Sequence, residues 1–362
     1  MTGKVLIPVC RNTEKNGLRS EEKMEPLIIP PKICAGDTVA FISLSGGRAG
    51  DRDMIGRYNL AKSRFEEEYR VHVVETPNAL RGSEFLYRHP ELRWADLEWA
   101  LTNPAVKGIL CNMGGDDSYR ILPWVNTKII HDNPKVFMGY SDISTWMAVF
   151  AHAGVRAYYG PNVLTPIGQV GKLDAYSKEA IRKALFSNEI IGEINPCEAY
   201  TPIEWNDSIK PEEIQWTPND GYSIVQGSGK ASGRLLVMMP GPMNQIMGTK
   251  YFPTKEMFDG AVLAIEHGRP YGNAMAGFHN LRAFAAAGVF DKASAIITGK
   301  LDDTSRSYLR KVICEEVHRD DMVILENVDF VHHTPMTVLP VGALCEIDCE
   351  RRTFTISEAG TR

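Results

Sequence analysis

Several common signatures are missing from this chain of 362 residues. No apolar run approaches the roughly 20 residues of a membrane-spanning helix. No run of Lys and Arg is long enough to indicate a surface for nucleic acid or membrane. The first residues (MTGKVLIPVCRNTEKNG) hold a short apolar patch without a cleavage site, so we expect no signal peptide. We therefore expect a cytoplasmic protein whose partners are neither nucleic acids nor membranes.

Signatures of metals and cofactors are missing as well. The seven cysteines are scattered and none forms a Cys-x-x-Cys pair, which argues against a zinc site or a redox motif and favours reduced thiols. The nine histidines show no His-Glu-x-x-His spacing, and there is neither a Walker motif nor a Gly-x-Gly-x-x-Gly loop. We expect neither a metal nor a cofactor.

What is present is the composition of a globular protein, with 44% hydrophobic residues, 23% charged residues and a net charge of −5. The length allows two domains of ordinary size. We divide the chain into an extension (1–26), an N-terminal domain (27–185), a linker or specificity loop (186–224) and a C-terminal domain (225–362).

Strands and helices alternate through the N-terminal domain. Apolar runs predict strands at 38–43, 71–75, 106–111 and 136–139, and helices at 54–68, 91–102, 144–153 and from after Gly115 to Ile121. This alternation predicts an α/β fold with a doubly wound, mostly parallel sheet of the flavodoxin or amidotransferase type.

The C-terminal domain is predicted to be smaller and mixed α/β. Its pattern predicts strands at 232–239, 261–266, 293–298, 322–326, 338–347 and 352–357, and a helix near 273–287. Between the domains, residues 198–230 crowd proline and glycine around Trp205 and Trp216. A plain connection and a functional loop both fit that composition.

A serine lies where an apolar strand ends and a helix begins. In the segment PKVFMGYSDI, Gly139 ends the strand, Ser141 follows two residues later, and the helix starts at once. This is the layout of a nucleophile elbow, in which the N–H groups of the helix start favour an oxyanion. An ordinary helix N-cap has the same pattern, so the segment alone leaves both explanations open.

A nucleophilic serine needs a general base and an orienting carboxylate. Glu266 ends an apolar strand, where it either faces a cleft or is a solvated strand end. His332 and His333 lie in a loop between two strands, as candidate bases or as turn caps. The Gly114-Gly115 pair follows a strand, where it either approaches a substrate closely or makes a tight turn.

Short motifs along almost the whole chain together resemble one family. They comprise Pro30-Pro31, 35–40 (AGDTVA), 93–97 (RWADL), Gly114-Gly115, 139–142 (GYSD), 160–162 (GPN), 248–253 (GTKYFP), 287–292 (AGVFDK) and 339–342 (LPVG). In order and spacing they resemble the L,D-carboxypeptidase family of serine peptidases, which includes the microcin C immunity peptidases. The segment at 248–253 resembles the immunity branch in particular.

The resemblance implies a Ser–His–Glu triad. By position, Ser141 would be the nucleophile, His332 the general base and Glu266 the orienting acid. The backbone N–H groups of Asp142 and of the Gly114-Gly115 turn would form the oxyanion hole.

The sequence departs from the family pattern at three points. An extra histidine makes the base ambiguous: alignment on the later Leu-Pro motif selects His332, which we prefer, whereas alignment on His-Thr selects His333. Val331 replaces a glycine. Residues 236–240 (LVMMP) replace the usual glycines and an Asn-Leu pair, in a segment expected to contact the substrate.

We therefore expect a serine hydrolase that cleaves an amide in a small peptide or a peptidyl- or aminoacyl-nucleotide, such as a microcin C-like compound. Trp205 and Trp216 are candidate substrate-binding residues because they could stack on an adenine, or they are loop anchors. The resemblance also implies a homodimer.

Three alternatives stay open. One is a carboxypeptidase that removes terminal D-Ala from murein tetrapeptides. Another is a non-catalytic protein that binds peptides or nucleotides on the same fold. A cysteine-dependent amidotransferase is disfavoured, because Cys111 lies inside a predicted strand and not on an elbow.

Overall fold

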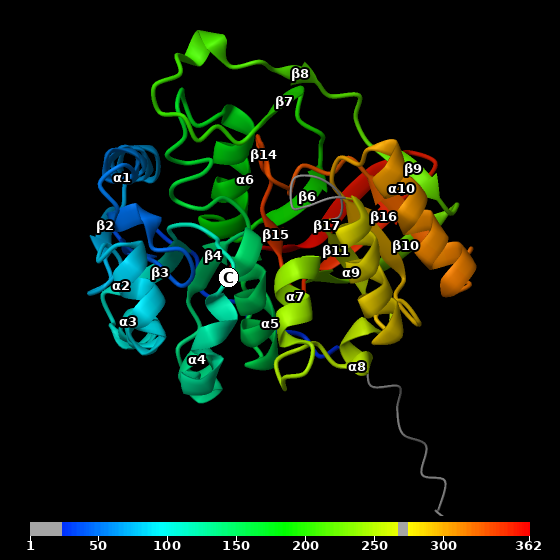
Figure 1. Cartoon of the computed structure of the whole chain (residues 1–362), viewed down its shortest axis with the longest axis horizontal. Coiled ribbons are helices and arrows are strands. Elements are labelled where there is room, and N and C mark those ends of the chain that lie inside the picture. Colours follow the sequence, from blue (N-terminus) through cyan, green and yellow to red (C-terminus); the bar gives the residue numbers. More distant parts are fainter. Residues whose placement is uncertain (1–23, 267–273) are drawn as a thin grey trace, which may run out of the picture.

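The computed structural model describes residues 24–266 and 274–362. Two lobes lie side by side, the first drawn in blue to green and the second mainly in yellow to red (Figure 1). Most of the predicted extension lies outside the described residues, but Met24 is already buried in the folded body. Within the described ranges, no helix is long and apolar enough to cross a membrane.

The first lobe is built on a parallel sheet. Its strands are β1 (Thr38–Ile42), β2 (His72–Glu75), β3 (Val106–Cys111), β4 (Val136–Gly139) and β5 (Tyr158–Tyr159). They lie in the order β2-β1-β3-β4-β5, which is the flavodoxin-type order of a doubly wound fold. The predicted fold class is confirmed. In such a sheet the ligand site lies at the carboxyl ends of the strands, near the point where the strand order reverses.

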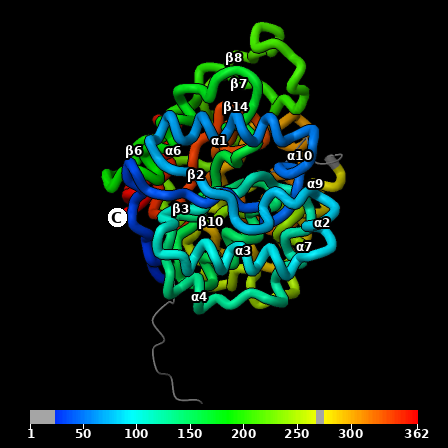
Figure 2. Tube along the Cα trace, turned by 90° about the vertical axis from the view of Figure 1, so that its left-hand side faces the viewer, coloured from blue at the N-terminus to red at the C-terminus, as the bar shows by residue number. Residues whose placement is uncertain are grey.

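Helices flank this sheet. They are α1 (Ile55–Tyr69), α2 (Ser83–Arg88), α3 (Pro90–Thr102), α4 (Thr127–Asp132), α5 (Ser144–His152) and α6 (Ala175–Leu185), with short 3-10 turns η1 (Arg48–Gly50), η2 (Ser118–Trp124) and η3 (Ser141–Ile143). Helices α1 and α3 run across the side that faces the viewer in Figure 2. The α-helix predicted to end at Ile121 is instead the 3-10 helix η2, which contains Pro123. Proline lacks the N–H that a longer α-helix would require there.

The second lobe is built on a mixed sheet. Its strands, in spatial order, are β6 (Ile190–Ile194), β17 (Thr353–Ala359), β16 (Leu344–Asp348), β10 (Lys230–Val237), β11 (Val262–Ile265), β12 (Ala295–Thr298), β13 (Val323–Glu326) and β9 (Ser223–Gln226). The central strands β10 to β13 are parallel and the outer pairings are antiparallel. The helices of this lobe are α7 (Pro240–Ile246), α8 (Lys255–Phe258), α9 (Ala274–Ala286) and α10 (Asp303–Arg310), which continues into the π-helical turn η5 (Lys311–Glu316).

The segment between the lobes is not merely a loop. It supplies β6 and β9 to the two edges of the second sheet. It also supplies β7 (Ala199–Pro202) and β8 (Thr217–Pro218), which form a small sheet with β14 (His333–Thr334), and the 3-10 turn η4 (Pro211–Glu213). The β7–β8 segment lies above α1 in Figure 2.

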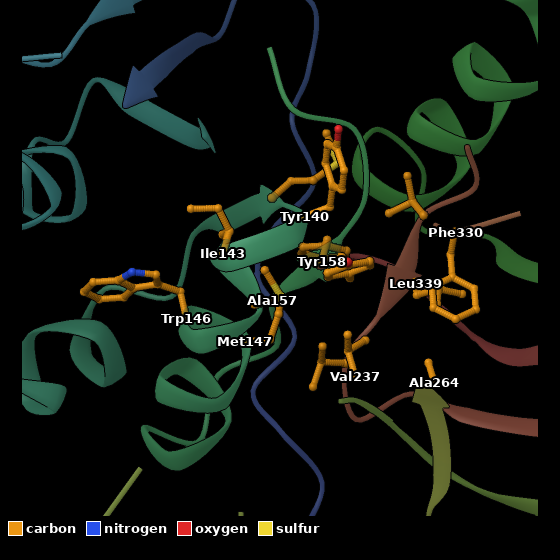
Figure 3. Packing of buried hydrophobic residues seen from close by; sticks show 14 of the residues in the cluster. Tyr140, Ile143, Trp146, Met147, Ala157, Tyr158, Val237, Ala264, Phe330 and Leu339 are labelled. Atoms are coloured by element: carbon orange, nitrogen blue, oxygen red, sulfur yellow. The ribbon is translucent and has the colours of Figure 1, made fainter. Parts of the chain in front are cut away.

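One predicted strand is two strands in the structure. The run 338–347 divides into β15 (Leu339–Pro340) and β16, separated by a turn in which Gly342 has a φ of 77°. β15 pairs with β5 of the first sheet, whereas β16 pairs with β10 of the second. The two lobes are therefore joined by strand pairing. Figure 3 shows apolar side chains of both lobes meeting at this junction, with Tyr158 and Leu339 near Val237 and Phe330.

Candidate functional site

Ser141 lies on a strained turn. Tyr140 separates it from the end of β4, it begins η3, and it has a φ of 66°, a left-handed conformation that is uncommon for a residue other than glycine. No side-chain hydrogen bond caps η3 or α5. The serine therefore has the geometry of an elbow and not that of an ordinary N-cap.

Glu266 and His332 are in direct contact. Nδ1 of His332 lies 2.5 Å from Oε1 of Glu266, and the backbone N–H of His332 donates to the same oxygen at 3.1 Å. Both side chains are buried. Burial of a charge is costly unless it is paired, so this carboxylate holds the imidazole in one orientation.

His333 lies in a different environment. The ring of Tyr200 meets its ring edge-on at 5.3 Å between centroids. Burial, and secondarily the charge of Lys300, lower the pKa of His333 to about 4. Of the two candidate bases, only His332 has a hydrogen bond to Glu266 among the contacts of the described residues.

Tyr159, at the end of β5, connects the serine to the carboxylate. Its hydroxyl accepts a hydrogen bond from the N–H of Ser141 at 3.1 Å and donates to Oε2 of Glu266 at 3.3 Å. Tyr159 belongs to none of the motifs that predicted the site. Its position at the carboxyl end of a short strand, immediately before Gly160, is the feature of the sequence that could have indicated a place in the site.

The Gly114-Gly115 pair lies against the serine. A Cβ on Gly114 would fall 2.8 Å from Oγ of Ser141 and 3.3 Å from the backbone nitrogen of Asp142. A Cβ on Gly115 would fall 2.7 Å from the backbone nitrogen of Gly46. Only glycine allows this approach, so Gly114 lies against Ser141 and Asp142, and Gly115 lines the same cavity as Ser141.

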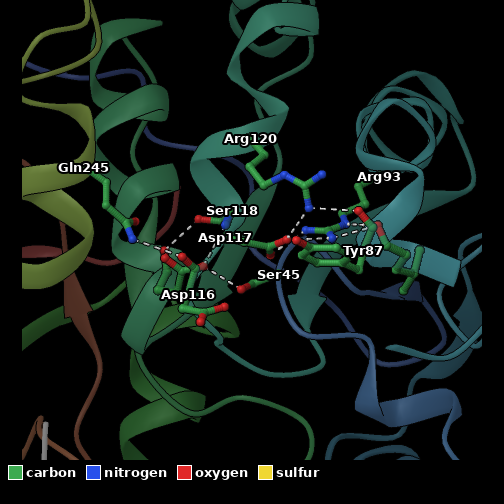
Figure 4. Close-up of polar contacts among 10 residues, drawn as sticks. Ser45, Tyr87, Arg93, Asp116, Asp117, Ser118, Arg120 and Gln245 are labelled. Atoms are coloured by element: carbon green, nitrogen blue, oxygen red, sulfur yellow. Dashed lines mark hydrogen bonds and ion pairs between the residues drawn. The ribbon is translucent and has the colours of Figure 1, made fainter. Parts of the chain in front are cut away.

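The carboxylate of Asp142 fixes the loops beneath the serine. Its Oδ2 accepts hydrogen bonds from Oγ of Ser45 at 2.5 Å and from the backbone N–H of Ser118 at 2.9 Å. Burial raises the pKa of Asp142, and these hydrogen bonds oppose the rise. Figure 4 shows Ser45 and Ser118 beside the ion pairs of Asp117 with Arg93 and Arg120.

Two cavities meet at Ser141. The first, which we call the Trp205 cavity, has a volume of about 380 Å³, and its lining includes Gly114, Tyr140, Ser141, Thr165, Trp205 and His332. The second, the α7 cavity, has a volume of about 190 Å³, and its lining includes Asp116, Ser141, Asp142, Met239, Gln245 and Asn280. Trp216 is about half exposed and lines neither cavity. In the described parts of the chain, no cluster of three or more His, Cys, Asp or Glu side chains is arranged to hold a metal ion.

Arg57 of α1 fixes the segment that carries Trp205. Its buried guanidinium donates to Oδ1 of Asp207 through Nε at 2.8 Å and to the carbonyl of Glu204 at 3.0 Å. The same group lies 5.2 Å from the ring centroid of Trp205, within cation–π range. Helix α1 thus holds the indole at the edge of the cavity.

Comparison with known proteins covers both lobes. Residues 39–160 match the model of the LD-carboxypeptidase N-terminal domain, and residues 232–347 match that of the LD-carboxypeptidase C-terminal domain. The microcin C7 self-immunity protein MccF of Escherichia coli is 29% identical over 355 residues, which span 92% of this chain and 96% of that protein. A putative carboxypeptidase of Vibrio cholerae is 28% identical over 343 residues, covering 90% of this chain and 96% of the relative.

A solved structure shares the whole fold. MccF in complex with aspartyl sulfamoyl adenosine superposes with a TM-score of 0.81 at 24% identity, covering 92% of this chain and 100% of that one. Both family models match in the expected order, and the relatives align over nearly their full length. The chain belongs to the LD-carboxypeptidase family.

Proposed function

We propose that this protein is a serine hydrolase in which Ser141 is the nucleophile, His332 the general base and Glu266 the orienting acid. The observation that carries the proposal is the buried contact of 2.5 Å between Oε1 of Glu266 and Nδ1 of His332. His332 lines the same cavity as Ser141, whose backbone is in a left-handed conformation. A structural histidine would not require a serine in a left-handed conformation beside it.

The reaction would proceed through an acyl-enzyme. Oγ of Ser141 attacks the amide carbonyl carbon while Nε2 of His332 takes the hydroxyl proton, and Glu266 stabilises the resulting imidazolium. The backbone N–H groups of Asp142 and the Gly114-Gly115 turn stabilise the oxyanion. His332 then gives the proton to the leaving nitrogen as the C–N bond breaks, and a water molecule that His332 deprotonates releases the acid.

The proposed substrate is a small peptide or an aminoacyl- or peptidyl-nucleotide such as a microcin C-like compound. Trp205 in the cavity wall favours a nucleotide, because an indole offers a base a stacking surface. The complex of MccF with aspartyl sulfamoyl adenosine supports the same class. We also propose a cytoplasmic location, since the six cysteines in the described residues are free. A homodimer is proposed on resemblance to the family alone.

Hydrolysis of murein tetrapeptides is the second candidate, because the family models are those of LD-carboxypeptidases. A terminal D-Ala is far smaller than a nucleotide, so it would leave much of the roughly 380 Å³ Trp205 cavity unfilled. The non-catalytic alternative predicts ligand binding without turnover.

The test is turnover measured by mass spectrometry. Wild type, Ser141→Ala and the exposed control Ser307→Ala are each incubated with aspartyl sulfamoyl adenosine and, separately, with a tetrapeptide ending in L-Lys-D-Ala. We expect the wild type and Ser307→Ala to cleave a substrate and Ser141→Ala to cleave none. Equal turnover by Ser141→Ala would refute the assignment of the nucleophile, and the substrate consumed decides between the two classes.

A further inference from the structure

The 328–334 loop, which carries the proposed base, starts beside the end of β12. The N–H of Val328 donates to the carbonyl of Thr298, the last residue of β12, at 3.0 Å. The N–H of Asn327 donates to the carbonyl of Gly299 at 3.1 Å. The end of β12 therefore fixes the backbone at the start of this loop.

A buried ion pair holds the same loop. Nζ of Lys300 lies 2.6 Å from Oδ1 of Asp329, and the two side chains are 11% and 1% exposed. Oδ2 of Asp329 accepts the N–H of Cys197 at 2.8 Å, and its backbone carbonyl accepts the N–H of Thr337 at 2.6 Å. A buried carboxylate is costly without a cation beside it, so Lys300 keeps Asp329 in place and with it the path of the chain to His332.

Packing holds the loop at a second point. Val331, which takes the place of the family's usual glycine, is buried immediately before His332. A Cβ on Gly299 would fall 2.7 Å from Cγ2 of Val331, so the valine occupies the space that this glycine leaves open. The departure from the family pattern is thus accommodated at the end of β12, next to Lys300.

The surroundings of His333 make it unsuited to act as the base. Its backbone pairs with Pro202 of β7, and its ring meets the ring of Tyr200. Nζ of Lys300 lies 4.3 Å from the centroid of the same tyrosine ring. Burial first and the charge of Lys300 second lower the pKa of His333. A general base becomes a cation when it takes a proton, and a neighbouring cation opposes that change.

We propose that Lys300 is a positioning residue: it holds the loop in the one path that places His332 against Glu266. The inference rests on the proposed function, in which His332 is the base. Lys300 is not among the described residues that line the Trp205 cavity or the α7 cavity, so its effect on turnover passes through the loop. That effect should appear in kcat and not in KM, because a displaced base no longer takes the proton while the substrate contacts remain.

The kinetic experiment removes both charges, in Lys300→Met combined with Asp329→Asn, because a single removal would leave a buried charge without its partner. With the test substrate that the wild type cleaves, we expect kcat to fall about tenfold or more and KM to stay within about twofold. Lys230→Met combined with Glu346→Gln removes an exposed pair of the same sheet and should keep both wild-type values. An unchanged kcat, or a loss confined to KM, would overturn the inference.

Proton NMR separates failure of this inference from failure of the proposed function. The proton of the short hydrogen bond between Nδ1 of His332 and Oε1 of Glu266 should resonate far downfield of the amide protons, and its loss in His332→Gln assigns it. We expect the variant without the Lys300–Asp329 pair to lose or shift this resonance while its circular dichroism spectrum stays that of the wild type.

Loss of the resonance in the folded variant supports the inference even if the wild type cleaves neither substrate. If the ion pair served stability alone, the resonance would persist and only the thermal midpoint would fall. A persisting resonance would therefore overturn the positioning role of Lys300. A wild type without the resonance would also overturn it, because His332 would then not be held against Glu266.

Discussion

At the scale of single residues, the adjacent histidines of the 328–334 loop differ in their partners. His332 contacts Glu266, whereas His333 is half-buried, and desolvation and the charge of Lys300 lower its pKa to about 4. A histidine in an unfolded chain titrates near pH 6.5, so between about pH 6.5 and 4 the unfolded state binds a proton that the folded state does not. Stability should therefore fall through that window as the pH is lowered, by roughly 3 kcal/mol from this group.

His333→Asn removes this titration. Its free energy of unfolding, measured by urea denaturation at pH 7 and at pH 4.5, should fall less with acidification than that of the wild type. His72→Asn replaces an exposed histidine of β2 and should keep the wild-type difference. An unchanged pH dependence in His333→Asn would show that other groups control acid stability.

Tyr159 should act as a positioning residue. Tyr159→Phe removes the hydroxyl that links the N–H of Ser141 to Glu266, so we expect kcat to fall about tenfold with little change in KM. Tyr158→Phe, on the same strand, removes a hydroxyl that donates to the carbonyl of Gly360 at 2.6 Å, and should lower thermal stability with kcat unchanged. Equal kcat values for the two variants would contradict the positioning role.

Part of this site could be predicted from the sequence and part could not. Ser141, Glu266 and the Gly114-Gly115 pair follow apolar strands, and the carboxyl ends of parallel strands meet at one edge of a sheet. Which of His332 and His333 approaches Glu266 depends on the backbone path of a loop, and hydrophobic periodicity does not predict that path. The contact between Tyr159 and Glu266 depends on how two lobes pack together, and local pattern does not determine that packing.

At the scale of elements, α1 and the segment that carries Trp205 act together. Arg57→Ala removes hydrogen bonds to Asp207 and Glu204, so the segment should open more often. We expect KM for a nucleotide substrate to rise by about tenfold or less, and limited proteolysis between β7 and β8 to become faster. Arg48→Ala is the matched control. The guanidinium of Arg48 also lies over the Trp205 ring, at 5.6 Å from its centroid, but its ion pair is with Asp53 and not with a residue between β7 and β8. Similar proteolysis of both variants would contradict the anchoring role.

Elements that form a local apolar run could be predicted from the sequence, and the two-residue strands could not. The strand β3 matches its expected bounds of 106–111, since all of its residues except Lys107 are buried, as is typical of a parallel strand. β15 and β16 were merged in the prediction because the apolar run is unbroken on both sides of Gly342. The turn there exists because one half pairs with β5 and the other with β10, and both pairings join residues far apart in the chain.

At the scale of the whole molecule, the C-terminal strand connects the lobes. Arg156 is buried, donates to the carbonyl of Ala359 at 2.8 Å and pairs with Glu358 at 2.5 Å. The last residue also forms backbone hydrogen bonds with the start of the first lobe, from Lys32 and to Pro30. Together with the β15–β5 pairing, these contacts should make the two lobes unfold as one cooperative unit.

The distribution of tryptophan allows a direct test of this cooperativity. All six tryptophans precede residue 217, so fluorescence reports the first lobe and the Trp205 segment, whereas far-UV circular dichroism reports both lobes. We expect the two thermal transitions to coincide, as they do in a two-state protein. Arg156→Ala should lower the midpoints of both transitions equally and reduce the free energy of unfolding by about 2 kcal/mol. The loss stays this small because Glu358 keeps its ion pair with Arg234 and is not left without a partner.

Arg182→Ala, which breaks an exposed pair with Glu179, should cost less than about 0.5 kcal/mol and is the control for loss of an arginine. If the lobes were independent, Arg156→Ala would shift the two signals by different amounts, and the fluorescence transition of the wild type would already separate from the dichroism transition. Coincident shifts would instead mean that the cleft around Ser141 persists only while both lobes are folded, because Ser141 and Glu266 come from different lobes and meet through Tyr159.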